Sequence, residues 1–131
     1  MTRTSSSEQL LEVTSVSQDD GVAVLGVAGE LDLSTAGQLH ERLLKSLADE
    51  ADVLVDLTQV SFIDSSGIAA LVGAFRSLNG SGGMSVLIAP GSQVARVFEV
   101  ARMSEALPIF TDRSAAVSGL TRPAAETSPR E

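Results

Sequence analysis

Residues 52–72 have the sequence DVLVDLTQVSFIDSSGIAALV, and this stretch decides the fold. Its first part, residues 52–57, is a short apolar run typical of a buried strand, and residues 68–72 open a helical pattern. The segment Asp64-Ser65-Ser66-Gly67 between them therefore places a serine at or beside a helix N-terminus. Free backbone N–H groups and the helix dipole favour an anion there. A phosphate on that serine would be tolerated locally while adding up to about two negative charges.

The sequence on either side alternates between strand and helix patterns. Strands are expected at 11–15, 22–28, 84–89 and 108–111, and helices at the leucines 39, 43, 44 and 47, at 92–101 and after Asp112 or Ser114. A strand hairpin followed by alternating helices and strands predicts a small α/β domain. We expect a mixed sheet of four to five strands, antiparallel at its start and parallel later, with about four helices packed on it.

Length and composition predict a single folded domain. The chain has 131 residues, of which 44% are hydrophobic, enough for one ordinary core. Polar, Ser/Thr-rich or Pro-rich composition at residues 1–9 and 121–131 predicts disordered ends, so the domain is expected to span residues 10–120. The chain contains no cysteine, which excludes disulfides and thiol chemistry and favours a reducing cytoplasm.

The charge of the chain indicates the kind of partner it has. The formal net charge is -8, which argues against nucleic acid and anionic membranes as direct ligands because a phosphate backbone needs a basic stripe. It favours a partner with a positive face. The first residues lack the apolar stretch of a signal peptide, and no apolar run is long enough to span a membrane.

The inventory of reactive side chains argues against an enzyme. The single lysine, Lys45, lies in the first predicted helix, whereas a receiver domain needs a lysine after a late strand. The single histidine, His40, is expected at the surface of an amphipathic helix. The segment before Ser65 lacks the glycine that a nucleophile elbow requires two residues before the serine. We therefore predict no catalytic residues, no metal and no cofactor, and Asp56 is interpreted as a turn residue.

The helix after Ser65 has an unusual composition. Its predicted core face is Ile68, Leu71, Val72, Phe75 and Leu78, and the opposite face carries only small residues, Ser66, Ala70, Gly73 and Ser77. A solvated face normally carries Glu, Lys or Gln, and glycine lowers helix propensity by roughly 1 kcal/mol relative to alanine. One interpretation is a flat surface on which a partner approaches the backbone closely. The alternative is a second helix or a loop of the same domain that covers this face.

Several segments together resemble a known family. They are Gly29-Glu30-Leu31-Asp32, Thr35-Ala36, Val53-Leu54-Val55-Asp56-Leu57, Phe62-Ile63-Asp64-Ser65-Ser66-Gly67 and Gly82-Gly83. In this register they resemble the STAS domain, and more narrowly the bacterial anti-sigma factor antagonists. The resemblance covers about residues 10–120.

The resemblance implies a non-enzymatic partner switch. The unphosphorylated antagonist would bind an anti-sigma factor, which is also a serine kinase of the histidine-kinase-like ATPase fold, and so release the sigma factor. The kinase would phosphorylate Ser65, ending the interaction, and a PP2C-type phosphatase would reverse this. The resemblance and the small-residue face together give the expected partner-binding residues: Glu30, Asp32, Asp64, Ser66, Gly67, Ala70 and Gly73.

Two alternatives stay open at this stage. The resemblance also fits a constitutive STAS subunit of a membrane lipid transporter, or a signalling scaffold, neither of which is phosphorylated. Locally, Ser65 could also serve as a helix N-cap, a common position for serine that is compatible with phosphorylation.

Overall fold

The structure is a computed structural model that describes residues 11–17, 21–49, 52–78 and 83–121. In chain order its elements are β1 (Leu11–Ser17), β2 (Val22–Leu31), α2 (Ala36–Asp49), β3 (Asp52–Ile63), α3 (Ser65–Arg76), β4 (Gly83–Leu87), α4 (Gln93–Val100), the 3₁₀ helix η1 (Met103–Glu105), β5 (Ile109–Phe110) and α5 (Arg113–Thr121). These elements confirm the predicted alternation of strands and helices.

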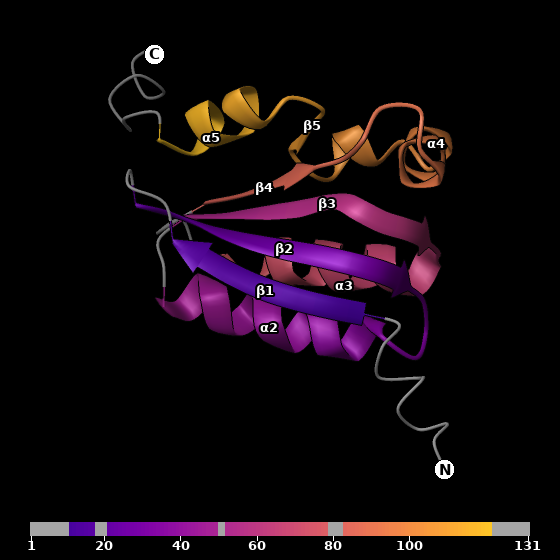
Figure 1. Cartoon of the computed structure of the whole chain (residues 1–131), viewed down its shortest axis with the longest axis horizontal. Helices are drawn as coiled ribbons and strands as arrows, with labels where there is room; N and C mark the ends of the chain where they lie inside the picture. Colours follow the sequence, from indigo (N-terminus) through magenta and orange to yellow (C-terminus); the bar gives the residue numbers. More distant parts are fainter. Residues whose placement is uncertain (1–10, 18–20, 50–51, 79–82, 122–131) are drawn as a thin grey trace.

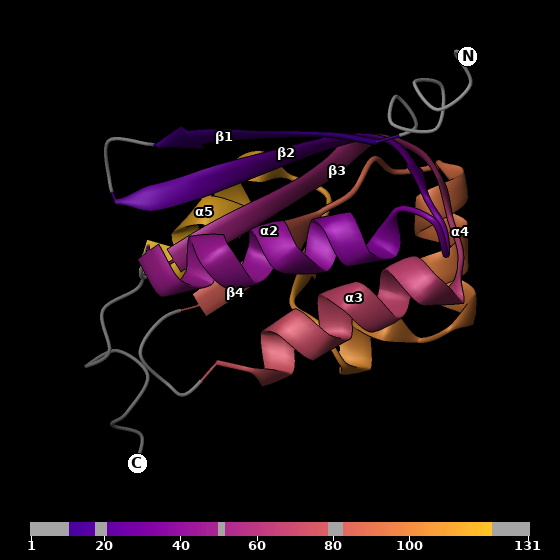
Figure 2. The same ribbon diagram turned by 90° about the horizontal axis from the view of Figure 1, so that it is seen from below.

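The five strands form one sheet in the order β1-β2-β3-β4-β5 (Figure 1). The β1–β2 pair is antiparallel and the three following pairs are parallel, as predicted. Right-handed crossovers that all advance in one direction place their helices on the same face of a sheet. Accordingly, α2 and α3 lie side by side on one face (Figure 2), and α5 packs on the other.

Hydrophobic packing on both faces explains the continuous apolar runs of the central strands. Along β3, Val53 and Val55 join the larger cluster with α2 and α3, whereas Leu54 joins the smaller cluster beneath α5. The hydroxyl of Ser85, itself buried, donates to the carbonyl of Ala116 at 3.2 Å and ties α5 to β4. The sheet is therefore a rigid platform for the loops at its carboxyl edge.

Several predicted boundaries shift in the structure. The strands β2 and β3 continue to Leu31 and Ile63, so both reach the segments that resemble the STAS motifs. Of the two caps predicted for the last helix, Asp112 and Ser114, the structure uses Asp112, whose Oδ2 accepts from the N–H of Ala115 at 3.0 Å. That helix ends at Thr121, the first residue of the expected C-terminal tail.

The remaining predictions for the termini lie outside the described residues. They concern the predicted disorder of residues 1–9 and 122–131. Among the helices that the structure describes, none is long and apolar enough to cross a membrane.

Candidate functional site

The site is formed where β3 ends and α3 begins. Asp64 is the N-cap of α3, and its Oδ1 accepts from the N–H of Ser66 at 2.9 Å. Ser65 is the first residue of the helix, and it is exposed. The prediction of a serine at a helix N-terminus is thus confirmed, but the N-cap is Asp64 rather than Ser65. A carboxylate is an equally good N-cap, and its use here leaves the Ser65 hydroxyl outside the cap.

The end of β2 lies directly beside this turn. The N–H of Asp64 donates to the carbonyl of Leu31 at 3.1 Å, and the strand register pairs Glu30 with Phe62. The loop after β2 therefore begins next to the start of α3. The structure brings together, at one edge of the sheet, the segments that carry Glu30, Asp32, Asp64 and Ser65, as the family resemblance implied.

Hydrogen bonds fix the conformation of the loop that follows β2. The backbone N–H and the hydroxyl of Ser34 donate to Oδ1 of Asp32 at 3.0 and 2.8 Å. The hydroxyl of Thr35, only 3% exposed as a residue, donates to the Glu30 carbonyl at 2.7 Å and accepts from the N–H of Asp32 at 3.0 Å. The hydrogen bonds from Ser34, its hydroxyl foremost, lower the pKa of Asp32 despite some desolvation. Asp32 is consequently ionised at neutral pH on a preorganised loop.

Close packing within the domain accounts for the glycine at position 67. A Cβ at this position would lie 2.9 Å from Leu31 Cβ and 2.9 Å from Ile63 Cγ1. The first turn of α3 can therefore approach the ends of β2 and β3 only because this residue has no side chain. Gly67 was predicted as a partner-binding residue, but it is buried.

The orientation of α3 differs in part from the predicted one. Of the predicted core face, Leu71 is buried and Ile68, Val72, Phe75 and Leu78 pack against the core, but the small residues Gly67, Ala70 and Ala74 are buried as well. Ala70 is 7% exposed, so it lies on the core side and not on an outer small-residue face. The small residues turn inward because they allow the helix to pack closely against its neighbours.

The exposed side of α3 is also flanked by α2. Gly73 is exposed, yet a Cβ added there would lie 3.4 Å from Nε2 of His40. His40 is half-buried and packs beside α3, whereas the sequence had placed it at the surface. The alternative that another helix of the same domain covers part of this face is thus correct. The part of α3 that stays exposed includes Ser65, Ala69 and Gly73.

Comparison with known proteins agrees with this arrangement. The sequence profile of the STAS domain matches residues 14–116. The chain belongs to the STAS domain family. The anti-sigma-B factor antagonist of Listeria monocytogenes is 39% identical over 84 residues, which cover 63% of this chain and 74% of that protein. The anti-sigma-F factor antagonist RsfB of Mycobacterium tuberculosis is 32% identical over 106 residues, covering 80% and 86%.

The fold of this STAS domain also resembles solved structures. The crystal structure of an anti-sigma factor antagonist from Mycobacterium paratuberculosis superposes with a TM-score of 0.76 at 23% identity, covering 84% of this chain and 93% of that chain. The predicted STAS-like α/β fold is confirmed by this likeness and by the five-stranded mixed sheet.

One residue that supports the site was missed in the sequence. The Gln93 side chain, in the first turn of α4, accepts from the N–H of Ile63 at 2.9 Å and donates to its carbonyl at 3.3 Å. Pairing between β3 and β4 ends at Asp56 and Leu87, so the amide of Gln93 replaces a strand neighbour next to Asp64. Nothing in the sequence signals this bond, because it depends on where α4 lies relative to β3.

We expect Gln93→Ala to destabilise the domain by about 1–3 kcal/mol, since it leaves the backbone groups of the buried Ile63 without partners. Urea unfolding would measure the loss, and hydrogen exchange should become faster at the Ile63 amide. Gln38→Ala, at an exposed position in α2, is the matched control and should leave both unchanged. Unaltered exchange at Ile63 in the Gln93 variant would contradict this positioning role.

Asp56 does not contribute to the site. It lies within β3, not in a turn as the sequence suggested, next to a shift in register between β2 and β3. Its Oδ1 accepts from the N–H and hydroxyl of Thr58 at 2.9 and 2.7 Å, and its Oδ2 pairs with Arg113 at 3.3 Å.

Among the described residues, no three His, Asp or Glu side chains are grouped closely enough to hold a metal ion.

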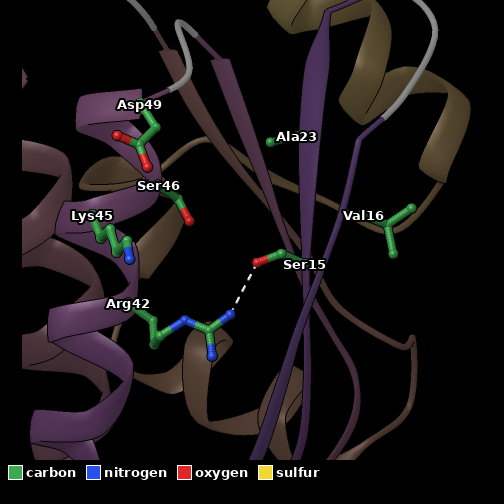
Figure 3. Close-up of a pocket in the computed structure, with 7 residues that line it drawn as sticks. All are labelled: Ser15, Val16, Ala23, Arg42, Lys45, Ser46 and Asp49. Carbon is green, nitrogen blue, oxygen red and sulfur yellow. Dashed lines mark hydrogen bonds between the residues drawn. The ribbon is translucent and has the colours of Figure 1, made fainter.

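A groove lies at the end of β2 opposite to the site around Ser65. This groove of about 490 Å³ is bounded by β1 and α2 and includes Lys45 (Figure 3). Arg42 spans it, donating to the Ser15 hydroxyl at 2.9 Å and to the Val13 carbonyl at 3.2 Å. These bonds join α2 to the edge strand. The groove is therefore separate from the site around Ser65.

Proposed function

We propose that this STAS domain is an anti-sigma factor antagonist switched by phosphorylation at Ser65. The observation that carries the proposal is an exposed serine at the first position of α3, beside the ionised Asp32 on a fixed loop. The relatives from Listeria and Mycobacterium, named as antagonists of anti-sigma-B and anti-sigma-F factors, support the same role. In its unphosphorylated form the domain binds an anti-sigma factor and thereby frees the sigma factor.

The chain needs no catalytic group of its own in this scheme. The anti-sigma factor acts as a serine kinase: the Ser65 hydroxyl attacks the γ-phosphorus of ATP, the bond to the β-phosphate breaks, and a base of the kinase takes the hydroxyl proton. A PP2C-type phosphatase hydrolyses the phosphoserine and restores the hydroxyl. This domain therefore acts as a cytoplasmic binding protein, and the chemistry belongs to its partners.

Phosphorylation changes the surface more than it changes the fold. The positive end of the α3 dipole stabilises an anion on Ser65, so the phosphorylated domain stays folded. The phosphate adds up to about two negative charges next to Glu30, Asp32 and Asp64. A partner interface that accommodates three carboxylates and a neutral hydroxyl then faces like-charge repulsion and an added desolvation cost.

A direct test uses purified proteins. Each anti-sigma factor kinase encoded by the same genome is incubated with the domain and Mg²⁺–ATP, followed by intact-mass measurement and peptide mapping. We expect one kinase to add a single phosphoryl group to Ser65 and then to dissociate. The Ser65→Ala variant should accept none and stay bound.

Other outcomes would contradict the proposal. Phosphate on Ser66 or Ser34 instead would move the switch to another residue. A kinase that forms a stable complex without transferring phosphate would favour a constitutive STAS subunit or scaffold.

A further inference from the structure

An exposed leucine lies in the loop that carries Asp32. Leu33 is 82% exposed, the highest value among the large apolar side chains that are exposed in the described part of the chain. Phe62 is also exposed, at 40%, and it pairs in register with Glu30 at the end of strands β2 and β3. We define the docking surface as Glu30, Asp32, Leu33, Phe62 and Ser65.

The exposed position of Leu33 is fixed by its neighbours in the loop. Asp32 before it and Ser34 after it are joined by two side-chain hydrogen bonds, and the N–H groups of Thr35 and Ala36 both donate to the Asp32 carbonyl, at 3.1 and 2.9 Å. A side chain presented on a rigid loop loses little additional conformational freedom on binding. Apolar side chains that fill a partner's pocket in this way contribute a large share of binding energy.

The charges around Leu33 indicate the chemistry of the pocket. The segments that border Leu33 carry three carboxylates, those of Glu30, Asp32 and Asp64. Two arginines are engaged elsewhere in the domain: Arg42 lies in the groove at the opposite end of β2, and Arg113 pairs with Asp56. A complementary surface would be apolar at its centre and basic at its rim.

We infer that Leu33 is the apolar anchor of the docking surface and inserts into a pocket of the anti-sigma factor that has a basic rim. This inference rests on the proposed function and adds to it the residue that provides affinity without charge. Docking of Leu33 would bring the partner's surface against the start of α3. A phosphate on Ser65 would then have to lose its water, which couples the anchor to the switch.

The test measures the dissociation constant of the unphosphorylated domain for the kinase that modifies Ser65, as a function of salt concentration. Leu33→Ala should weaken binding at least about tenfold, whereas Leu33→Met should retain most of the affinity. The salt dependence of Leu33→Ala should match that of the unmodified domain, because an apolar contact is not screened. Asp32→Asn keeps the Oδ1 acceptor of the loop and should reduce the salt dependence instead.

The matched control is Val16→Ala, which truncates another exposed apolar residue, 59% exposed, paired with Val24 near the start of β2. It should leave the affinity unchanged, and thermal unfolding should show that each variant is folded. Wild-type affinity in Leu33→Ala, together with lost binding in Ser65→Asp, would overturn the anchor while leaving the switch intact. Absence of binding to every kinase of the genome would overturn both.

Discussion

Ser65→Asp should weaken binding to the anti-sigma factor at least about tenfold, and Ser65→Ala should bind as tightly as the wild-type domain. The aspartate introduces a permanent carboxylate at the first position of α3, on an edge already bordered by Glu30 and Asp32. It carries less charge than a phosphate, so the phosphoprotein should bind more weakly still. Calorimetric titration of the wild-type domain, Ser65→Ala, Ser65→Asp and the phosphoprotein against the purified kinase measures the order of affinities.

A matched control separates the location of the charge from its mere presence. Ser114 is an exposed serine in the first turn of α5, a helix that also begins after a capping aspartate, Asp112. This helix packs on the face of the sheet away from α2 and α3. Ser114→Asp therefore adds the same charge in a similar local setting and should leave binding unchanged. Equal affinities of Ser65→Asp and the wild-type domain would refute the proposed switch.

The position of Ser65 at the start of α3 was predictable from the sequence because it depends on local order along the chain. An apolar strand, an Asp-Ser-Ser-Gly segment and a helical pattern follow one another within residues 52–72. Parallel pairing of β2 with β3 then places Glu30 and Asp32 at the same edge. The strand order follows from the same regularity, since each parallel strand is added beside the previous one through a helix.

The rotation of α3 was only partly predictable from hydrophobic periodicity. Of the predicted core face, Leu71 is buried and Ile68, Val72, Phe75 and Leu78 pack against the core, but the structure buries Ala70 and Ala74 more completely than those four. Periodicity detects where large apolar side chains recur, whereas close approach between elements requires small ones. The contact of Gln93 with Ile63 was missed for a related reason, since it joins residues that only the tertiary fold brings together.

A further prediction links the close packing of Gly67 to both the stability of the domain and the phosphorylation of Ser65. Gly67→Ala should destabilise the domain by about 1–2 kcal/mol, because overpacking costs about 1–3 kcal/mol and the gain in helix propensity offsets only part of it. The added Cβ would lie 2.9 Å from the Cβ of Leu31, an atom fixed to the backbone that cannot rotate away. Relief of this contact requires the first turn of α3 to move away from β2. We therefore also expect slower phosphorylation of Ser65, measured under conditions where the variant is fully folded.

Gly73 provides the matched control on the same helix. A Cβ there would lie 3.4 Å from His40 Nε2, an ordinary contact, and the position is exposed, so Gly73→Ala should stabilise the domain by roughly 0.5–1 kcal/mol. The midpoint of urea unfolding should thus shift in opposite directions for Gly67→Ala and Gly73→Ala. If both alanines stabilised the domain, the close approach of α3 to Leu31 would not limit packing. If Gly67→Ala lost stability but kept the rate of phosphorylation at Ser65, that packing would support the fold without positioning the serine.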